Sequence, residues 1–235
     1  MVTSRKNHTL HIVVPVYNEA ENFPRLYEEL SKKIHTPYKL IVVYDFDEDT
    51  TVPVVKKYLK KDKRISLVKN TKGRGVLYAI LTGFEAVKNG PLLVTMADLS
   101  DDLKVVDDMY QLYLQGADVV CGSRYMKGGK QIGGPLLKRI LSRTAGLSLR
   151  YIRRFPTHDI TNNFKLYDKA FIDSIEIESV GGFEIAMEIT TKAFENKKSI
   201  KEVPSTWKDR TAGDSNFKLV QWLPSYLKWY FRALF

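Results

Sequence analysis

The sequence predicts an α/β fold in which a Rossmann-like, mostly parallel β-sheet carries helices on both faces. In the N-terminal half, short apolar runs rich in β-branched residues alternate with longer segments of helical periodicity. This alternation is typical of right-handed βαβ units, whose strands form a parallel sheet. The chain of 235 residues has an ordinary apolar fraction of 44% and is long enough to bury a substantial core.

The expected elements of this half follow in order from the spacing of apolar residues. The run LHIVVPV is β-branched and is stopped by Pro15, which predicts a buried strand over residues 10–16. Asn18 is then expected to cap a helix that runs to about Ile34, because apolar residues recur there at helical spacing. By the same criteria, later strands are expected at residues 40–44, 65–69, 92–96 and 117–121. Later helices are expected at residues 51–61, after the GRG segment at 73–75 through Val87, and around residues 103–115.

A different pattern begins near residue 122. The segment KGGKQIGG at 127–134 predicts a mobile, glycine-rich loop. A basic helix is expected after it, from about Pro135 to Arg154. The remaining expected elements are a short strand at 164–167, a helix at 181–196 and a final strand at 200–207.

Charge is unevenly distributed along the chain. Lys and Arg number 37 against 27 Asp and Glu, and eight basic residues with no acidic one lie between Tyr125 and Phe155. Such a segment attracts nucleic acid, lipid headgroups or phosphorylated substrates, although a solvated helix face has the same composition. The one cysteine, Cys121, excludes an internal disulfide, suits a reducing compartment and is expected to pack in the core.

Four short polar segments carry the functional prediction. They are VPVYNE at 14–19, DFDED at 45–49, MADLSDD at 96–102 and DRTAGDS at 209–215. In this order they resemble the family 2 glycosyltransferases and, among these, the dolichol-phosphate mannose synthase-like branch, which acts on polyprenyl phosphates. The resemblance covers about residues 10–220. It implies a GT-A fold and an inverting transfer of sugar from a nucleoside diphosphate sugar.

The resemblance also implies a donor site formed by loops at the strand ends. Asp45 matches the acid that recognises the nucleotide base, and Asp98 matches a contact to the metal or the diphosphate. A turn-forming role for Asp45 and a helix-capping role for Asp98 are the structural alternatives. The donor residues implied are Pro15, Tyr17, Glu19, Asp45, Lys72, Ala97 and Asp98.

A divalent metal, Mg²⁺ or Mn²⁺, is implied as the cofactor, with Asp98 and Ser100 as its ligands. The chain departs from the family pattern here, because Met96 stands where the first carboxylate of an Asp-x-Asp motif is usual. A thioether is a poor ligand for a hard cation, so waters and diphosphate oxygens would have to complete the site.

The acceptor side is implied by the later segments. Arg210 is expected to clamp a phosphate, and Ser215 to add a hydroxyl contact. The segment DITNNFK at 159–165 resembles the part of the branch that lines the acceptor cavity, with Lys165 as a phosphate contact. Arg124 is assigned to the same side, and Glu184 is the candidate catalytic base.

The acceptor decides whether a base is needed. A lipid phosphate is already an anionic nucleophile, whereas a sugar hydroxyl must lose a proton to a nearby carboxylate. We expect a polyprenyl phosphate; the alternative is a saccharide or other hydroxyl acceptor, with Glu184 or Asp101 as the base. A nucleic-acid-binding module is disfavoured because acidic residues gather at the strand ends. A nucleotidyltransferase is disfavoured because VPVYNE is not a glycine-rich, basic signature.

The C-terminal segment suits a membrane surface. Residues 217–235 contain two Trp, three consecutive aromatics at 229–231 and spaced Lys and Arg, a composition typical of the headgroup region. No apolar run reaches the ~18 residues of a membrane span, and residues 1–9 do not resemble a signal peptide. We predict a cytoplasmic protein held peripherally on the cytoplasmic face of a membrane; packing of this segment on the domain is the alternative.

One domain is expected over residues 1–216. Its nucleotide-binding half is expected at about 1–122 and its acceptor-side half at about 123–216. An amphipathic helix is expected at 217–235.

Overall fold

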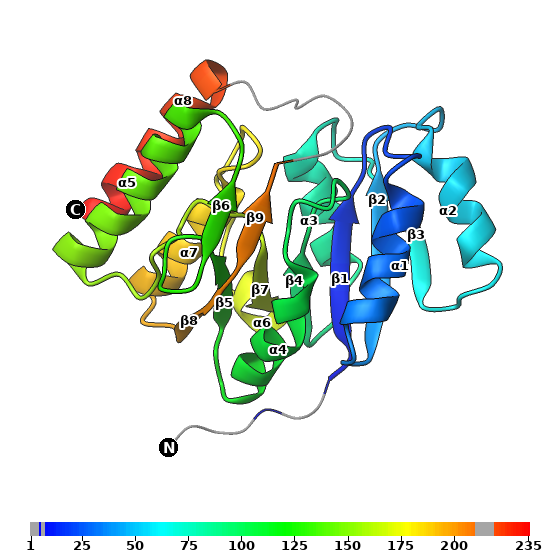
Figure 1. Ribbon diagram of the computed structural model, residues 1–235, viewed down its shortest axis with the longest axis horizontal. Coiled ribbons are helices and arrows are strands. Elements are labelled where there is room, and N and C mark those ends of the chain that lie inside the picture. The colour runs from blue at the N-terminus through cyan, green and yellow to red at the C-terminus, as the bar shows by residue number, and fades with distance from the viewer. Residues whose placement is uncertain (1–4, 6–7, 210–218) are drawn as a thin grey trace.

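The computed structural model describes Arg5, residues 8–209 and residues 219–235. A seven-stranded sheet in the order β3-β2-β1-β4-β7-β5-β8 forms its centre, and β6 and β9 form a second, two-stranded sheet (Figure 1). The strands are β1 (Leu10–Pro15), β2 (Tyr38–Tyr44), β3 (Ile65–Lys69), β4 (Pro91–Val94), β5 (Val119–Ser123), β6 (Lys130–Ile132), β7 (Lys165–Asp168), β8 (Ile200–Pro204) and β9 (Thr206–Lys208).

Parallel pairing dominates the large sheet, which confirms the predicted α/β class. Strand β1 pairs in parallel with β2 and β4, and the β2–β3 and β5–β8 pairs are also parallel. Strand β7 is the exception, because it lies antiparallel between β4 and β5. Its first residue, Lys165, therefore pairs with Val94 and Cys121 near the carboxyl ends of the neighbouring strands. The loop that precedes β7 consequently reaches the edge of the sheet where the other strands end.

Helices cover both faces of the sheet, as the periodicity predicted. Within β1, Ile12 packs with residues of α1, α2 and α4, while Val13 packs with residues of α3, α7 and α8. Successive side chains of a strand point to opposite faces, so a strand buried on both faces is continuously apolar. The helices are α1 (Phe23–Lys33), α2 (Thr51–Leu59), α3 (Val76–Glu85), α4 (Val106–Leu114), α5 (Leu136–Arg153), α6 (Lys169–Asp173), α7 (Ile185–Glu195) and α8 (Leu219–Leu234), with a 3₁₀ turn at Leu103–Val105.

The first helix begins later than the sequence predicted. Asn18 has a φ of +55°, in the left-handed region, and α1 begins only at Phe23. The Asn18 side chain accepts a hydrogen bond from the Thr50 backbone N–H (3.1 Å). The prediction that Asn18 caps the first helix is therefore wrong, because its side chain bonds to the backbone just before α2.

The predicted final strand at 200–207 is divided between the two sheets. Strand β8 ends at Pro204, and β9 pairs instead with β6, which lies within the glycine-rich segment predicted as a loop. Proline has no N–H to donate, so it suits the end of a strand. The Ser205 backbone bonds both to Ser123 and to Lys130, and so joins the two sheets.

Helix α8 packs against α5 and α7 at one end of the molecule, opposite α2 and β3 (Figure 1). Trp229 is 1% exposed, and Arg232 forms ion pairs with Glu178 and Glu195. The Tyr230 hydroxyl lies 2.9 Å from the Ser148 hydroxyl of α5. Of the helices that the structure describes, none is sufficiently long and apolar to cross a membrane.

Candidate active site

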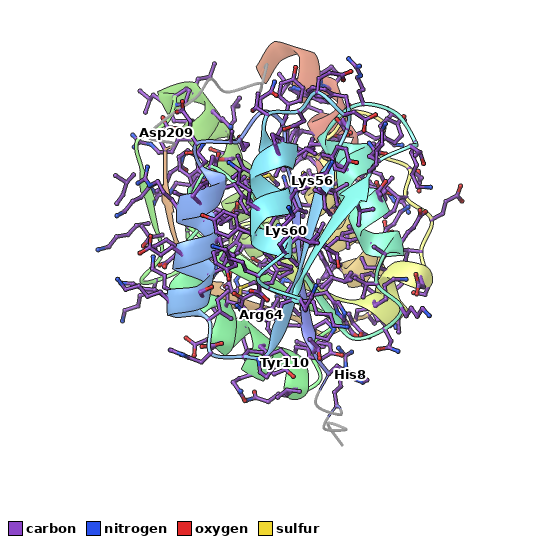
Figure 2. All side chains as sticks on the ribbon, turned by 90° about the vertical axis from the view of Figure 1, so that its right-hand side faces the viewer. His8, Lys56, Lys60, Arg64, Tyr110 and Asp209 are labelled. Atoms are coloured by element: carbon purple, nitrogen blue, oxygen red, sulfur yellow. The ribbon has the colours of Figure 1, made fainter. Side chains whose placement is uncertain are left out.

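The predicted donor residues gather where the parallel strands end. Pro15 is the last residue of β1, Asp45 follows β2, and Asp98 follows β4 four residues after Val94. Because the three strands are neighbours and parallel, these residues share one edge of the sheet. In Figure 2, Asp209 lies towards this edge and His8, which precedes β1, lies at the opposite end of the molecule. Ligands of open α/β sheets bind at this edge.

Tyr17 is the exposed aromatic of the site. Its side chain is 54% exposed, and its ring meets that of Phe46 edge-to-face at 5.5 Å between centroids. Phe46 is also contacted by the Arg74 guanidinium, 5.3 Å from the ring centre. Glu19 lies two residues further on and accepts a hydrogen bond from the Asn22 side chain (2.6 Å). The site therefore has an aromatic wall with a cation beside it, which can hold a nucleoside by stacking.

Asp45 is held by two donors from the loop between β3 and α3. The Asn70 side-chain amide donates to Oδ1 (2.8 Å), and the Gly75 backbone N–H donates to Oδ2 (2.8 Å). Each carboxylate oxygen has a second lone pair, so Asp45 can still accept from a ligand. Lys72 of the same loop is partly exposed and forms an ion pair with Glu85 (2.9 Å).

The segment after β4 turns sharply at Asp98. Ser100 donates its backbone N–H to Asp98 Oδ1 (3.1 Å), and Leu99 between them has a φ of +60°. A leucine in the left-handed region is uncommon and costs on the order of 1 kcal/mol. Ala97 is buried, and Asp98 is 9% exposed. The turn therefore places a nearly buried carboxylate beside the Ser100 side chain.

A second carboxylate lies close to Asp98. Asp101 accepts hydrogen bonds from the Thr95 hydroxyl (2.9 Å) and the Met96 backbone N–H (3.3 Å). Burial and the nearby Asp98 charge raise the pKa of Asp101 to about 7. From the sequence, Asp101 was expected only as the base of the alternative reaction with a hydroxyl acceptor. Its bond from the Met96 N–H brings a carboxylate next to the position where this chain lacks the first carboxylate of the family motif.

Two neighbouring carboxylates fit a hard divalent cation, which would relieve their mutual repulsion. Within the described residues, no cluster of three or more His, Cys, Asp or Glu side chains could hold a metal ion. Asp98, Asp101 and the Ser100 hydroxyl would thus supply only part of a coordination sphere. Substrate oxygens and water would supply the rest.

Arg124, predicted to contact the acceptor, is buried in an ion pair. Its Nε and Nη2 donate to the two carboxylate oxygens of Asp159 (2.6 and 2.9 Å), and Nη2 also donates to the Thr161 hydroxyl (3.0 Å). Burial alone would raise the pKa of Asp159, but the guanidinium more than offsets this and holds the pKa below its usual value. The Arg124 side chain is 8% exposed. Its geometry favours holding the loop before β7 over direct contact with a substrate.

Lys165 and Glu184 are also committed to internal contacts. Lys165 is 0% exposed, and its ammonium donates to the backbone carbonyls of Ile160 (3.0 Å) and Asn162. Burial lowers the pKa of Lys165. Glu184 is also 0% exposed, and its two oxygens accept from the N–H groups of neighbouring glycines at 181 and 182 (both 2.6 Å). These positions argue against the expected phosphate contact and the expected base, because neither group reaches an open surface.

Arg210 and Ser215 lie outside the described residues. The residues just before them run beside the Asp98 turn, since Lys208 donates its N–H to the Ser100 carbonyl (2.9 Å). The next residue, Asp209, donates its N–H to Ile132 of β6 (2.9 Å). Lys208 and Asp209 thus lie beside the Asp98 turn and β6.

A surface hollow of about 670 Å³ lies away from this edge. It is formed between α1 and α2 and includes Arg25, Tyr27 and Tyr58. No predicted site residue lines it. We therefore place the active site at the strand ends and not in this hollow.

Comparison with known proteins identifies the family. The model of the family "Glycosyl transferase family 2" matches residues 11–175. A dolichol-phosphate mannosyltransferase of Pyrococcus furiosus is 29% identical over 212 residues, covering 88% of this chain and 58% of the relative's length. A polyprenol monophosphomannose synthase of Mycolicibacterium smegmatis is 28% identical over 236 residues, covering 94% and 89% of the two chains.

Solved structures show the same fold. A glucosyl-3-phosphoglycerate synthase from Mycobacterium tuberculosis, in complex with Mn²⁺, UDP and glucosyl-3-phosphoglycerate, superimposes with a TM-score of 0.69 at 15% identity. The match covers 99% of this chain and 81% of that one. The same protein bound to UDP alone gives a TM-score of 0.71.

Proposed function

Because the chain belongs to glycosyl transferase family 2, we propose that it transfers a sugar from a nucleoside diphosphate sugar to a polyprenyl phosphate at a membrane surface. The observation that carries the donor half is the convergence of Tyr17, Asp45 and Asp98 at the ends of adjacent parallel strands. The acceptor half is supported by the names of two relatives, a dolichol-phosphate mannosyltransferase and a polyprenol monophosphomannose synthase.

On the donor side, each residue has a distinct task. Asp45 would accept a ring N–H of the base, and the exposed Tyr17 ring would pack against the nucleoside. Glu19 would bond a ribose hydroxyl. Lys72, in the loop that follows Asn70, would contact the phosphates once its ion pair with Glu85 opened.

The diphosphate would lie beside the Asp98 turn. Asp98, Asp101 and Ser100 would hold a divalent cation there, and the cation would neutralise charge on the departing diphosphate. Arg210 and Ser215, which follow Asp209 in the sequence, would bind the same phosphates. A structure of the Mycobacterium tuberculosis relative contains both Mn²⁺ and UDP-glucose.

The bond-forming step would be a single displacement at the anomeric carbon. A phosphate oxygen of the lipid forms the new bond as the bond to the diphosphate oxygen breaks, and the nucleoside diphosphate leaves. The nucleophile is already anionic, so no proton has to be removed. This suits a site in which Glu184 already accepts two backbone hydrogen bonds.

Helices α5 and α8 provide the surface that would meet the membrane. They lie side by side (Figure 1), and α5 carries basic residues with no acidic one. An apolar and basic surface of this kind binds the headgroup region of anionic bilayers. We therefore place the protein peripherally on the cytoplasmic face of a membrane. The exposed apolar side chains of the pair are Leu136, Leu137, Ile140, Leu141, Tyr151, Ile152, Leu227, Phe231 and Phe235.

A hydroxyl acceptor is the second candidate, and Asp101 is the observation that favours it. Its carboxyl, with a pKa raised to about 7, is able to accept a proton near neutral pH. Such a reaction would use a saccharide or another hydroxyl compound as acceptor.

Release of nucleoside diphosphate from GDP-mannose and UDP-glucose separates these candidates. The assay is run with Mn²⁺, with and without polyprenyl phosphate in detergent. Release that requires the lipid phosphate and yields a glycolipid supports the proposal. Release that depends on a soluble hydroxyl acceptor favours the second candidate. Absence of release from both compounds contradicts transfer from either of these two donors.

A further inference from the structure

Asn70 lies at the junction of the donor loops and has no assigned role in the site. It directly follows β3, is 5% exposed, and donates its backbone N–H to the Tyr44 carbonyl (2.8 Å). This bond extends the β2–β3 pairing to the residue before Asp45. Asn70 is thus fixed relative to the end of β2.

The side chain of Asn70 uses all of its hydrogen-bonding positions. Its amide nitrogen donates to Asp45 Oδ1 (2.8 Å) and to the Gly73 carbonyl. Its amide oxygen accepts from the Lys72 backbone N–H (2.9 Å) and the Thr82 hydroxyl (3.1 Å). A primary amide has two donor hydrogens and two acceptor lone pairs, so this is its full capacity.

These bonds join two parts of the donor site, the Asp45 carboxylate and the loop over residues 72–75. The bond from the Thr82 hydroxyl ties Asn70 to α3, outside the donor site. The loop needs such support, because Gly73 and Gly75 have φ values of +141° and +121°. Glycines in these regions lose much conformational entropy on folding. An ordinary turn asparagine bonds only to its own backbone neighbours, whereas Asn70 also holds a carboxylate 25 residues away.

We propose that Asn70 is a positioning residue for nucleotide binding: it orients Asp45 and the 72–75 loop towards the nucleoside. This inference rests on the proposed donor site. Without the amide, Asp45 would keep only its bond from Gly75, and both the carboxylate and the loop would sample other conformations. Loss of Asn70 should therefore weaken nucleotide affinity more than it slows the displacement step.

Two variants of Asn70 and one control test this. Asn70→Ala removes all four side-chain bonds. The isosteric Asn70→Asp keeps the oxygen that accepts from Lys72 and Thr82 but places a carboxylate oxygen against Asp45. The control, Thr82→Val, removes the bond that the Asn70 amide oxygen accepts from Thr82. It leaves in place the bond that the amide nitrogen donates to Asp45.

The measurements are made at least 10 °C below the melting temperature of each variant. Titration calorimetry gives Kd for GDP and UDP, and steady-state assays separate the donor KM from kcat. Hydrogen exchange of peptides covering residues 70–78 in nucleotide-free protein reports on the loop itself. This last readout does not depend on catalysis.

For Asn70→Ala we expect Kd for the bound nucleotide and donor KM to rise about tenfold, with kcat changed by less than about threefold. Exchange of residues 72–75 should become faster. Asn70→Asp should weaken binding at least as much, and Thr82→Val should change Kd by less than about twofold.

Unchanged Kd and unchanged exchange in the Asn70 variants would overturn the inference while leaving the proposed function intact. A fall in melting temperature without a change in Kd would do the same, because it would show a purely structural role. If the wild-type protein bound neither GDP nor UDP, the donor assignment and the inference would both fail.

Discussion

Replacing Arg124 by Met should strongly destabilise the protein. The change removes the guanidinium and leaves the Asp159 carboxylate, which is 0% exposed, without its bidentate partner. Breaking a buried ion pair from one side costs about 3–5 kcal/mol, because the remaining charge stays buried. For a domain of this size, that corresponds to a fall in melting temperature of roughly 6–20 °C.

The dependence on pH provides a sharper test. In the wild type the pKa of Asp159 is lowered. The ionised carboxylate therefore stabilises the folded protein above a pH of about 4, which is the pKa of an aspartate in the unfolded chain. This stabilisation is lost only as the pH falls through the lower pKa that Asp159 has in the folded protein. In Arg124→Met the guanidinium no longer offsets burial, and only the Lys165 charge and the remaining hydrogen bonds to the carboxylate oppose it, so the pKa of Asp159 should rise. The variant therefore regains stability as the pH falls and Asp159 takes up a proton. The stability difference between the two proteins should narrow from pH 8 to pH 5.

Urea unfolding followed by tryptophan fluorescence at several pH values measures this difference. Arg150→Met is a matched control, because Arg150 donates to the neutral Phe155 carbonyl (3.0 Å) and its loss should cost only about 0.5–1.5 kcal/mol. Arg124→Met combined with Asp159→Asn should recover part of the loss. A cost below about 1 kcal/mol, or a difference that does not vary with pH, would refute the assigned burial and pairing.

Three further predictions concern the metal site, the membrane surface and a helix end. Asp98→Asn keeps an oxygen that accepts from the Ser100 N–H, so the melting temperature should change little. Metal-dependent release of nucleoside diphosphate should fall by about 10²-fold or more, and near-normal turnover would contradict the role of Asp98. Leu137 and Ile140 are 59% and 51% exposed, so replacing both by Glu should leave the urea unfolding midpoint constant. The double variant should sediment with anionic vesicles at least about fivefold less than the wild type, and unchanged sedimentation would argue against α5 as a bilayer contact. Lys197 has a φ of +53° after α7, so Lys197→Gly should stabilise the protein by about 1 kcal/mol in urea unfolding, and a lower midpoint would contradict this.

The spacing of apolar residues along the chain predicted most of the helices and strands, because it shows which faces of each element are buried. The run at 40–44 is apolar without alternation, and it lies within β2, buried on both faces of the sheet. The same pattern predicted that Asp45 and Asp98 would share an edge, since the ends of neighbouring parallel strands meet there. These conclusions needed only the order of residues along the chain and the geometry of a parallel sheet.

The pairing of distant side chains was decided by the tertiary structure. The sequence predicted Lys165 as an accessible cation, but the antiparallel β7 buries it, and its ammonium donates hydrogen bonds to backbone carbonyls. Glu184 is likewise enclosed by its own loop. For Asp101 the structure had the opposite effect: it brought the carboxylate close to Asp98 at the candidate site. In each case the sequence determined which charged group was present, while the path of the backbone determined whether that group meets water, a partner or another charge.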